Sequence, residues 1–337
     1  MAINVTLEQF NTILNEWRED YHIFAPARFK DAGAFSDTDQ IRYDEITAVE
    51  AIIWNQKTHF SFKEVILPIT QRLFYFTESA VTQASLNEKQ LIVFLRSCDL
   101  HAVKRLDEVY LGGEFDDIYY RAFREKTKFV VMGCAKSFDS CFCLSMETNR
   151  TDDFDGYVHL SDVGVHLEIR NEDLKAKSVT SEEVAFAPEF VTENETVVHV
   201  PEKLNLKAIY ADMWEEYSVR CIGCGRCNFS CPTCTCFTTQ DVCYKDNPKC
   251  GERRRVWASC QVDGFTTMAG NHNFREPKGQ RMRFKTLHKI YDFKKRYDYH
   301  MCVGCGRCTD VCPEYISFAA AINKLNDFSK EEANHDT

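Results

Sequence analysis

The stretch CIGCGRCNFSCPTCTC at residues 221–236 places six cysteines within sixteen positions. A shorter version, CVGCGRCTDVCP, recurs at residues 302–313. Each copy contains the spacing C-x2-C-x2-C-x3-C-P, with one glycine inside each of the first two intervals. This repeat is the clearest internal duplication in the chain, and its closely spaced cysteines indicate that the C-terminal part of the protein binds a metal cofactor.

The spacing is that of bacterial-type ferredoxin motifs, in which three closely spaced thiolates ligate one cluster and the fourth ligates the other. The glycines let the backbone adopt positive φ angles and approach the cluster closely. The sequence therefore predicts two [4Fe–4S] clusters. The first would be held by Cys221, Cys224, Cys227 and Cys312, and the second by Cys302, Cys305, Cys308 and Cys231, so we expect iron to be bound through these cysteines.

Zinc is the alternative metal, because paired C-x2-C motifs are also a zinc signature. The region would then be a zinc-stabilised interaction module without redox chemistry. A zinc site takes four ligands in a tetrahedron, whereas C-x2-C-x2-C places three of them on one short loop. This crowding occurs twice, each time completed by Cys-Pro, and favours clusters over zinc.

Five further cysteines lie in or after the first motif. We interpret Cys243 and Cys250 as small buried hydrophobic residues, the commonest role of a free cysteine. The same role is open to Cys234, Cys236 and Cys260, as is a further metal site, and the sequence does not decide between them.

The N-terminal part has four cysteines of its own. Cys98 and Cys134 each follow an apolar run that predicts a β-strand. If these strands are parallel neighbours, both thiols lie at the carboxyl edge of the sheet, where such sheets bind ligands. Cys141 and Cys143 follow shortly afterwards, and four convergent thiolates would hold a third [4Fe–4S] cluster. Four separate core cysteines are the alternative.

The composition is that of an ordinary globular protein, with 337 residues, 44% hydrophobic residues and a net charge of −10. This length predicts about two domains. The N-terminus does not resemble a signal peptide and no apolar run is long enough for a membrane span, so we expect a cytoplasmic protein. In a reducing compartment, the seventeen cysteines favour metal ligation over disulfides. The acidic charge argues against a nucleic-acid partner.

The pattern of apolar residues predicts an α/β domain over residues 1–202. Thr6 and Gln9 have the spacing of a capping box at the start of a helix. A second helix is expected at 99–110. Strands are predicted at 65–69, 73–76, 91–95, 129–133 and 165–169.

Residues 203–337 are expected to form an α-helical ferredoxin domain with two [4Fe–4S] clusters. Apolar periodicity predicts helices at 206–217, 282–297 and 314–325. The stretch from 249 to 296 also carries an excess of Lys and Arg over Asp and Glu. Its arginines could offset the negative charge of the clusters or form a docking face for an acidic partner. These arginines are Arg253, Arg254, Arg255, Arg281 and Arg283.

Several cofactor motifs are missing from the sequence. It contains no glycine-rich dinucleotide turn, no phosphate-binding P-loop and no C-x-x-C-H haem attachment site. The chain is therefore predicted to carry single electrons without binding a substrate. We expect one part of an oxidoreductase complex, which is not catalytic alone.

Several motifs together resemble the iron–sulfur electron-transfer subunit of the anaerobic sulfite reductases and, less closely, the iron–sulfur β subunits of cytoplasmic sulfhydrogenases. The sequence departs from this pattern at Asn271, where a glycine is expected. The motifs are RSCD at 96–99, SCFC at 140–143, the cysteine stretch at 220–236, RRRVWASC at 253–260, AGNHNFR at 269–275, RFKTLHK at 283–289 and MCVGCGRCTDVCP at 301–313.

The resemblance implies a cytoplasmic complex of three subunits. A flavoprotein subunit would oxidise NADH, this chain would pass electrons singly, and a sirohaem subunit would reduce sulfite to sulfide. It implies the same eight cysteine ligands and strengthens the expectation of a third cluster. The alternative from the second family is an electron-transfer β subunit of a hydrogenase or sulfhydrogenase complex.

Overall fold

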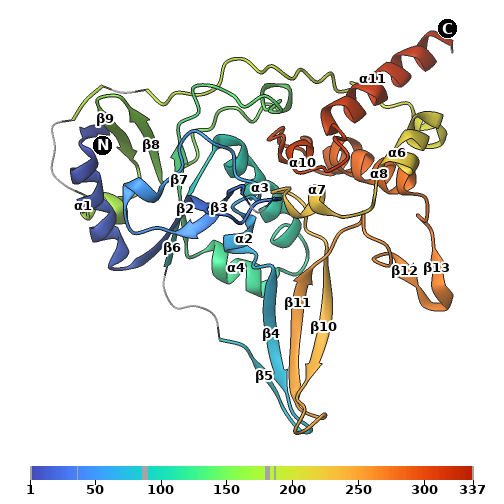
Figure 1. Cartoon of the computed structure of the whole chain (residues 1–337), viewed down its shortest axis with the longest axis horizontal. Coiled ribbons are helices and arrows are strands. Elements are labelled where there is room, and N and C mark those ends of the chain that lie inside the picture. The colour runs from blue at the N-terminus through green and yellow to red at the C-terminus, as the bar shows by residue number, and fades with distance from the viewer. Residues whose placement is uncertain (1, 36, 86–89, 179–182, 186, 336–337) are drawn as a thin grey trace. The chain divides into compact units, whose positions relative to one another are not determined.

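The computed structural model describes residues 2–35, 37–85, 90–178, 183–185 and 187–335 (Figure 1). The chain forms two compact units, each assembled from three segments. Unit 1 contains Met1–Lys136, Asn149–Thr192 and Thr239–Val256, and unit 2 contains Ser137–Thr148, Glu193–Thr238 and Trp257–Thr337. The sequence predicts a single boundary instead, between residues 202 and 203, and that simpler division stays a prediction.

A seven-stranded sheet forms the centre of unit 1, in the order β1-β9-β8-β7-β6-β2-β3 (Figure 1). Its middle strands β2, β6, β7 and β8 pair in parallel, and the outer pairings are antiparallel. The predicted strands at 91–95, 129–133 and 165–169 are therefore confirmed. The strands are β1 (Ala2–Val5), β2 (Tyr21–Phe29), β3 (Gln40–Glu45), β6 (Gln90–Leu95), β7 (Thr127–Met132), β8 (Gly156–Ser161) and β9 (Gly164–Ile169).

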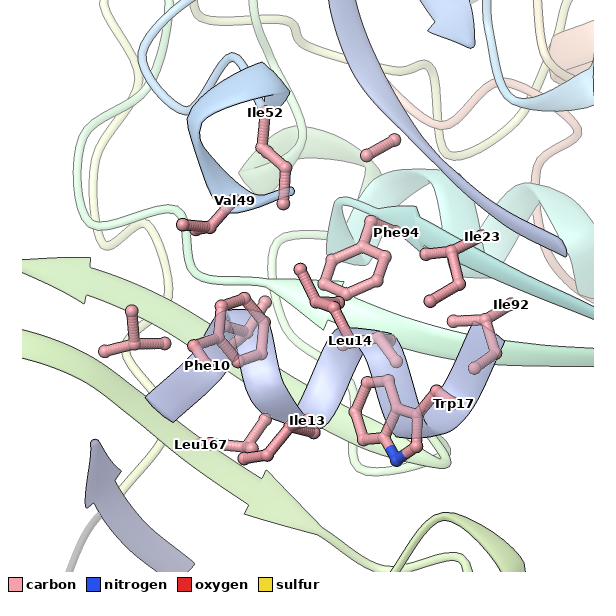
Figure 2. Packing of buried hydrophobic residues seen from close by; sticks show 14 of the residues in the cluster. Phe10, Ile13, Leu14, Trp17, Ile23, Val49, Ile52, Ile92, Phe94 and Leu167 are labelled. Atoms are coloured by element: carbon pink, nitrogen blue, oxygen red, sulfur yellow. The ribbon is translucent and has the colours of Figure 1, made fainter. Parts of the chain in front are cut away.

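Helix α1 (Leu7–Arg18) packs on this sheet through the buried side chains of Phe10, Ile13, Leu14 and Trp17 (Figure 2). The predicted capping box is confirmed, since the Gln9 amide donates to Thr6 Oγ1 at 3.2 Å and the Thr6 amide donates to Gln9 Oε1 at 2.9 Å. Phe10 packs edge-on against Phe94 of β6, with ring centroids 6.4 Å apart. Trp17 is fully buried and donates its indole N–H to the Leu174 carbonyl at 3.0 Å.

Helix α3 (Ser97–Tyr110) begins the helical connection from β6 to β7, which parallel pairing requires. It begins two residues before the predicted start at Asp99. The strand predicted at 65–69 is wrong, because α2 (Lys63–Ile66) ends there and Pro68 follows, a residue without a backbone N–H for a sheet. The other short helices of unit 1 are η1 (Val49–Ala51), α4 (Ile118–Arg124) and α5 (Glu172–Ala176).

A second, four-stranded sheet has the order β10-β11-β4-β5 (Figure 1). It consists of β4 (Thr70–Phe76), β5 (Val81–Gln83), β10 (Phe237–Cys243) and β11 (Gly251–Trp257). The expectation of a helical region from residue 203 onward is wrong for β10 and β11. All of β10 is exposed, so no apolar alternation marked it as a strand.

The three consecutive arginines of β11 are held by acidic and amide side chains within unit 1. Arg253 binds both oxygens of Asp241 at 2.6 Å, and Arg254 pairs with Glu252. Arg255 is almost fully buried and donates to Asp117 and to Gln71, each at 2.5 Å. These charges therefore stabilise the second sheet and its attachment to α4.

Replacing Arg255 by alanine should destabilise unit 1 by about 3 kcal/mol, because it leaves the buried side of Asp117 without its cation. Arg253→Ala is the matched control on the same strand. Its ion pair with Asp241 is 43% exposed on both sides, and exposed pairs contribute little. Chemical denaturation followed by circular dichroism measures the free energy of unfolding of both variants. Equal decreases for the two would contradict the structural role assigned to the buried Arg255.

Unit 2 contains mostly short helices between cysteine-rich loops. The predicted helix at 282–297 is present as a continuous run of α8 (Lys278–Leu287), a π-helical turn η6 (His288–Asp292) and α9 (Phe293–Tyr297). The predicted helix at 206–217 is instead two 3-10 turns, η3 (Leu206–Tyr210) and η4 (Asp212–Trp214), followed by α6 (Glu215–Arg220). The last helix, α11 (Phe318–His335), starts four residues later than predicted.

The expectation of an α-helical ferredoxin domain is therefore wrong in its detail. The two helices inside the cysteine motifs, α7 (Arg226–Phe229) and α10 (Arg307–Asp310), have only four residues each. A proline shortly after each of them cannot continue a helix. A small hairpin of β12 (Thr267–Met268) and β13 (His272–Asn273) is also present. None of the described helices has both the length and the apolar character needed to cross a membrane.

Candidate iron–sulfur centres

The two cysteine motifs adopt the same backbone conformation in unit 2. In the first, Gly223 and Gly225 have φ angles of 72° and 75°; in the second, Gly304 and Gly306 have 65° and 71°. The second glycine of each pair directly precedes a four-residue helix. Residues with a Cβ atom rarely adopt this left-handed backbone conformation, so glycine is required at these positions. The sequence repeat is thus a structural repeat.

One pocket of unit 2 is lined by the first three cysteines of the first motif and the last cysteine of the second. Cys221, Cys224, Cys227 and Cys312 share it with apolar side chains that include Met282 and Phe318. The Gly223 amide donates to Cys221 Sγ and the Ile316 amide to Cys312 Sγ, both at 3.4 Å. We call this pocket 1.

A second pocket is lined by the complementary set of thiols. Cys302, Cys305, Cys308 and Cys231 surround it together with Phe142 and Phe318. Phe318 and Cys308 also line pocket 1, so the two pockets are direct neighbours. We call this one pocket 2.

The donor chemistry of both pockets fits a [4Fe–4S] cluster. Pocket 2 offers four cysteine sulfurs, and pocket 1 offers four together with that of the shared Cys308. Both linings are largely apolar, and backbone N–H groups donate to sulfur in pocket 1. Hydrogen bonds to the sulfurs and exposure to solvent are the main protein contributions to a cluster's potential. The two pockets differ in exposure, because Cys302 and Cys305 are buried whereas Cys224 is exposed.

Two buried lysines also line the pockets, and the sequence did not predict them. Lys285 lines both pockets and Lys289 lines pocket 2. Burial alone would lower the pKa of Lys285, but the thiols of Cys227, Cys308 and Cys234 raise it well above its usual range. The pKa of Lys289 is raised in the same way by Cys231, Cys234 and Cys302.

A signal for these lysines was present in the helix pattern. Met282, Thr286, Ile290 and Phe293 are buried along the same helical run. Lys285 and Lys289 fall next to them at helical spacing, and therefore on the buried side. A single sequence does not distinguish such positions from the many exposed lysines.

Cys234, Cys236 and Cys260, whose roles the sequence does not decide, lie within unit 2 beside the pockets. Cys234 is hydrogen-bonded to Cys231, and Cys236 to Cys260. The bond from Cys236, with further donation from Gln261 and Asn228, lowers the pKa of Cys260 to about 5 in spite of its burial.

Cys243 and Cys250 belong to unit 1 and line neither pocket. The expectation that both are buried is wrong. Cys243 is exposed at the end of β10, and Cys250 is half-buried. The Asn247 side-chain amide donates to Cys250 Sγ at 3.2 Å.

The four cysteines of the N-terminal part are divided between the units. Cys98 and Cys134 belong to unit 1 and follow β6 and β7, which are parallel neighbours as expected. The Arg96 guanidinium donates to the Gly133 carbonyl and ties the ends of these strands together. Cys141 and Cys143 belong to unit 2. A third cluster on these four thiols stays a prediction.

Within unit 2, the segment that carries Cys141 and Cys143 packs against the second cysteine loop. The Phe142 amide donates to the Gly304 carbonyl at 2.8 Å, and Thr148 Oγ1 donates to the Val303 carbonyl at 2.7 Å. Cys141 Sγ lies 3.6 Å from the Cys305 carbonyl oxygen. The segment therefore forms one wall of pocket 2.

Two other arginines of the basic stretch bind backbone carbonyls of unit 2. Arg281 is buried, donates to the carbonyls of Gln261 and Glu276 and pairs with Asp263. Arg283 donates to the Ile209 carbonyl at 2.7 Å. The five arginines named from the sequence therefore bind carboxylates, amides and carbonyls, and the lysines supply the positive charge that lines the cysteine pockets.

Comparison with known proteins agrees with this geometry. Residues 220–316 match the family described as a 4Fe-4S dicluster domain. Over 340 residues the chain is 26% identical to sulfhydrogenase 2 subunit beta of Pyrococcus furiosus, and the alignment covers 95% of this chain and 97% of that protein. The matched range 220–316 contains both cysteine motifs and both lysines. The protein is thus similar along nearly its whole length to a sulfhydrogenase beta subunit, and it carries a 4Fe–4S dicluster domain at residues 220–316.

Proposed function

We propose that the chain is the iron–sulfur electron-transfer subunit of an oxidoreductase complex and passes single electrons between its partner subunits. The observation that carries this proposal is the pair of adjacent cysteine-lined pockets in unit 2, which share Cys308. A [4Fe–4S] cluster, when bound, takes up and releases one electron. Pocket 1 would use Cys221, Cys224, Cys227 and Cys312 as ligands, and pocket 2 would use Cys302, Cys305, Cys308 and Cys231.

The residues around the pockets suggest where electrons are exchanged with a partner. Cys302 and Cys305 of pocket 2 are buried, whereas Cys224 of pocket 1 is exposed. Val219, Ile222 and Tyr315 lie close in sequence to the ligands of pocket 1 and are 86%, 55% and 86% exposed. The Arg220 guanidinium donates to the carbonyls of Glu314 and Tyr315 and holds the two segments together. Pocket 1 is therefore the exchange point, through an apolar rim.

Two kinds of complex fit this role. The similarity to a sulfhydrogenase beta subunit supports a hydrogenase partner. The sequence motifs support a sirohaem sulfite reductase partner, which reduces sulfite to sulfide with electrons from a flavoprotein subunit that oxidises NADH. In both, the complex is cytoplasmic and this chain is not catalytic alone. A zinc-stabilised module has less support, since a tetrahedral zinc site does not explain three cysteines on one short loop, twice over, each completed by Cys-Pro.

Purification of the native complex without oxygen distinguishes these proposals. Sirohaem absorption with sulfite-dependent NADH oxidation supports the sulfite reductase. Nickel with hydrogen-dependent reduction of the clusters supports the hydrogenase. A complex whose clusters are not reduced by any partner subunit would contradict the electron-transfer proposal.

Replacing Tyr315 by aspartate should slow electron exchange with the partner about tenfold, because it places a charge in the apolar rim beside pocket 1. Tyr210→Asp is the matched control, since Tyr210 is also 86% exposed in unit 2 but is distant in sequence from the cysteines of pocket 1, whereas Tyr315 stands between the pocket-lining residues Glu314 and Ile316. The rate is read from cluster absorption after the chain is mixed with reduced partner. Equal rates for the two variants would place the exchange point elsewhere.

A further inference from the structure

Lys285 and Lys289 lie one helical turn apart, on α8 and the π-helical turn that follows it. Each side chain is only 3% exposed. Lysine is seldom buried to this extent unless its charge is paired. Two neighbouring buried ammonium groups therefore require an explanation from their surroundings.

The contacts of these ammonium groups are thiols, a hydroxyl and an aromatic ring. Lys289 Nζ donates to the buried Thr233 hydroxyl at 2.8 Å. Lys285 is hydrogen-bonded to Cys227, and its Nζ lies 5.3 Å from the centre of the Phe318 ring. Within the described part of the chain, neither ammonium has a carboxylate within ion-pair distance. Burying a charge without an opposite charge is strongly unfavourable.

The missing negative charge is available in the pockets that the lysines line. A cluster held by four thiolates has a net negative charge, and reduction adds one more. Lys285 lines both pockets, so its charge acts on both; Lys289 lines pocket 2 alone. A fixed positive charge next to a cluster stabilises the reduced form more than the oxidised form, and so raises the reduction potential.

We propose that Lys285 and Lys289 are the built-in countercharges of the two cluster pockets, and that they raise the reduction potentials of the clusters and favour electron residence in pocket 2. This inference rests on the proposed function, because it assumes that the pockets hold clusters. It explains why the neighbouring arginines, which bind carboxylates and carbonyls, are not needed for this purpose. It also predicts the direction of electron transfer between the pockets, towards pocket 2, since pocket 2 has two lysines in its lining and the more exposed pocket 1 has one.

The test is a redox titration of the full chain, purified without oxygen and followed by EPR. Lys289→Met should lower the reduction equilibrium constant of the pocket 2 cluster at least tenfold, which is about 59 mV for a one-electron couple, and leave pocket 1 nearly unchanged. Lys285→Met should lower both potentials. Lys289→Arg should keep the wild-type potential because it keeps the charge. Lys295→Met, at an exposed position of α9, is the control.

Unchanged potentials in Lys289→Met with the clusters intact would overturn the inference. If Lys289→Met does not assemble its clusters, Lys289→Arg decides: assembly at the wild-type potential supports a charge role, and failure of this variant as well overturns it in favour of a purely steric role. Failure of the proposed function gives a different result. If the potentials depend on the lysines as expected but the clusters exchange no electrons with any partner, the proposed electron-transfer function is wrong and the countercharge role stands. Wild-type protein that contains no iron would contradict both proposals.

Discussion

Replacing Cys312 by serine is expected to reduce the iron content of the chain from about eight to about four atoms, by emptying pocket 1 alone. The reason is that Cys312 comes from the second sequence motif but lines the pocket of the first. Serine is a poor ligand for iron in such clusters, so the three remaining cysteines do not retain the cluster. Iron analysis and EPR spin counting of the reduced protein measure the loss. Cys250→Ser, in unit 1, is the control that keeps all the iron.

Double variants test the exchange of ligands between the motifs directly. Cys221→Ser with Cys312→Ser removes two ligands from one pocket, and should retain about four irons. Cys302→Ser with Cys312→Ser removes one ligand from each pocket, and should retain none. The reverse pattern would show that each motif holds its own cluster, and would contradict the pocket assignments.

Replacing Gly304 by alanine should destabilise unit 2 by about 3 kcal/mol or more and release the pocket 2 cluster. Gly304 has a φ of +65°, a conformation that costs a side chain roughly 1–2 kcal/mol. In addition, a Cβ atom here would collide with the Phe142 carbonyl oxygen and lie 2.8 Å from Cys143 Cα. These are backbone atoms of the wall of pocket 2 and have little room to move, so overpacking adds about 1–3 kcal/mol.

Gly264→Ala separates these two costs. Gly264 also has a positive φ, of +82°, but nothing lies within 4 Å of its added Cβ. This variant should therefore show the conformational cost alone, about 1 kcal/mol, and keep its clusters. The stability of both variants is measured as the guanidinium concentration at which half of the cluster absorption is lost. Similar midpoints for the two would show that the packing of Phe142 on the loop is unimportant.

The cysteine loops are the part of the structure that could be predicted best. Ligand spacing and glycine position are local properties, and they determine a short loop with positive φ angles before a helix. The grouping of Cys312 with the first motif followed from the ferredoxin pattern, and the structure brings the same side chains into one pocket. Their role as ligands stays a prediction.

Features that depend on distant parts of the chain were not predictable in the same way. The burial of Lys285 and Lys289 depends on how the helical run packs in unit 2, which one sequence does not reveal. The arginines at 253–255 were expected near the clusters or on a docking face, but Arg255 instead binds Asp117, which is 138 residues away. Strand β10 is exposed along its whole length, so apolar alternation did not mark it.

The central claim is that the cysteine pockets hold two iron–sulfur clusters, and metal analysis tests it most directly. The measurement is iron, acid-labile sulfide and zinc per chain in one sample purified without oxygen. We expect about eight irons and eight sulfides, or about twelve of each if Cys98, Cys134, Cys141 and Cys143 also hold a cluster. A chain that contains zinc without iron or sulfide would contradict the claim.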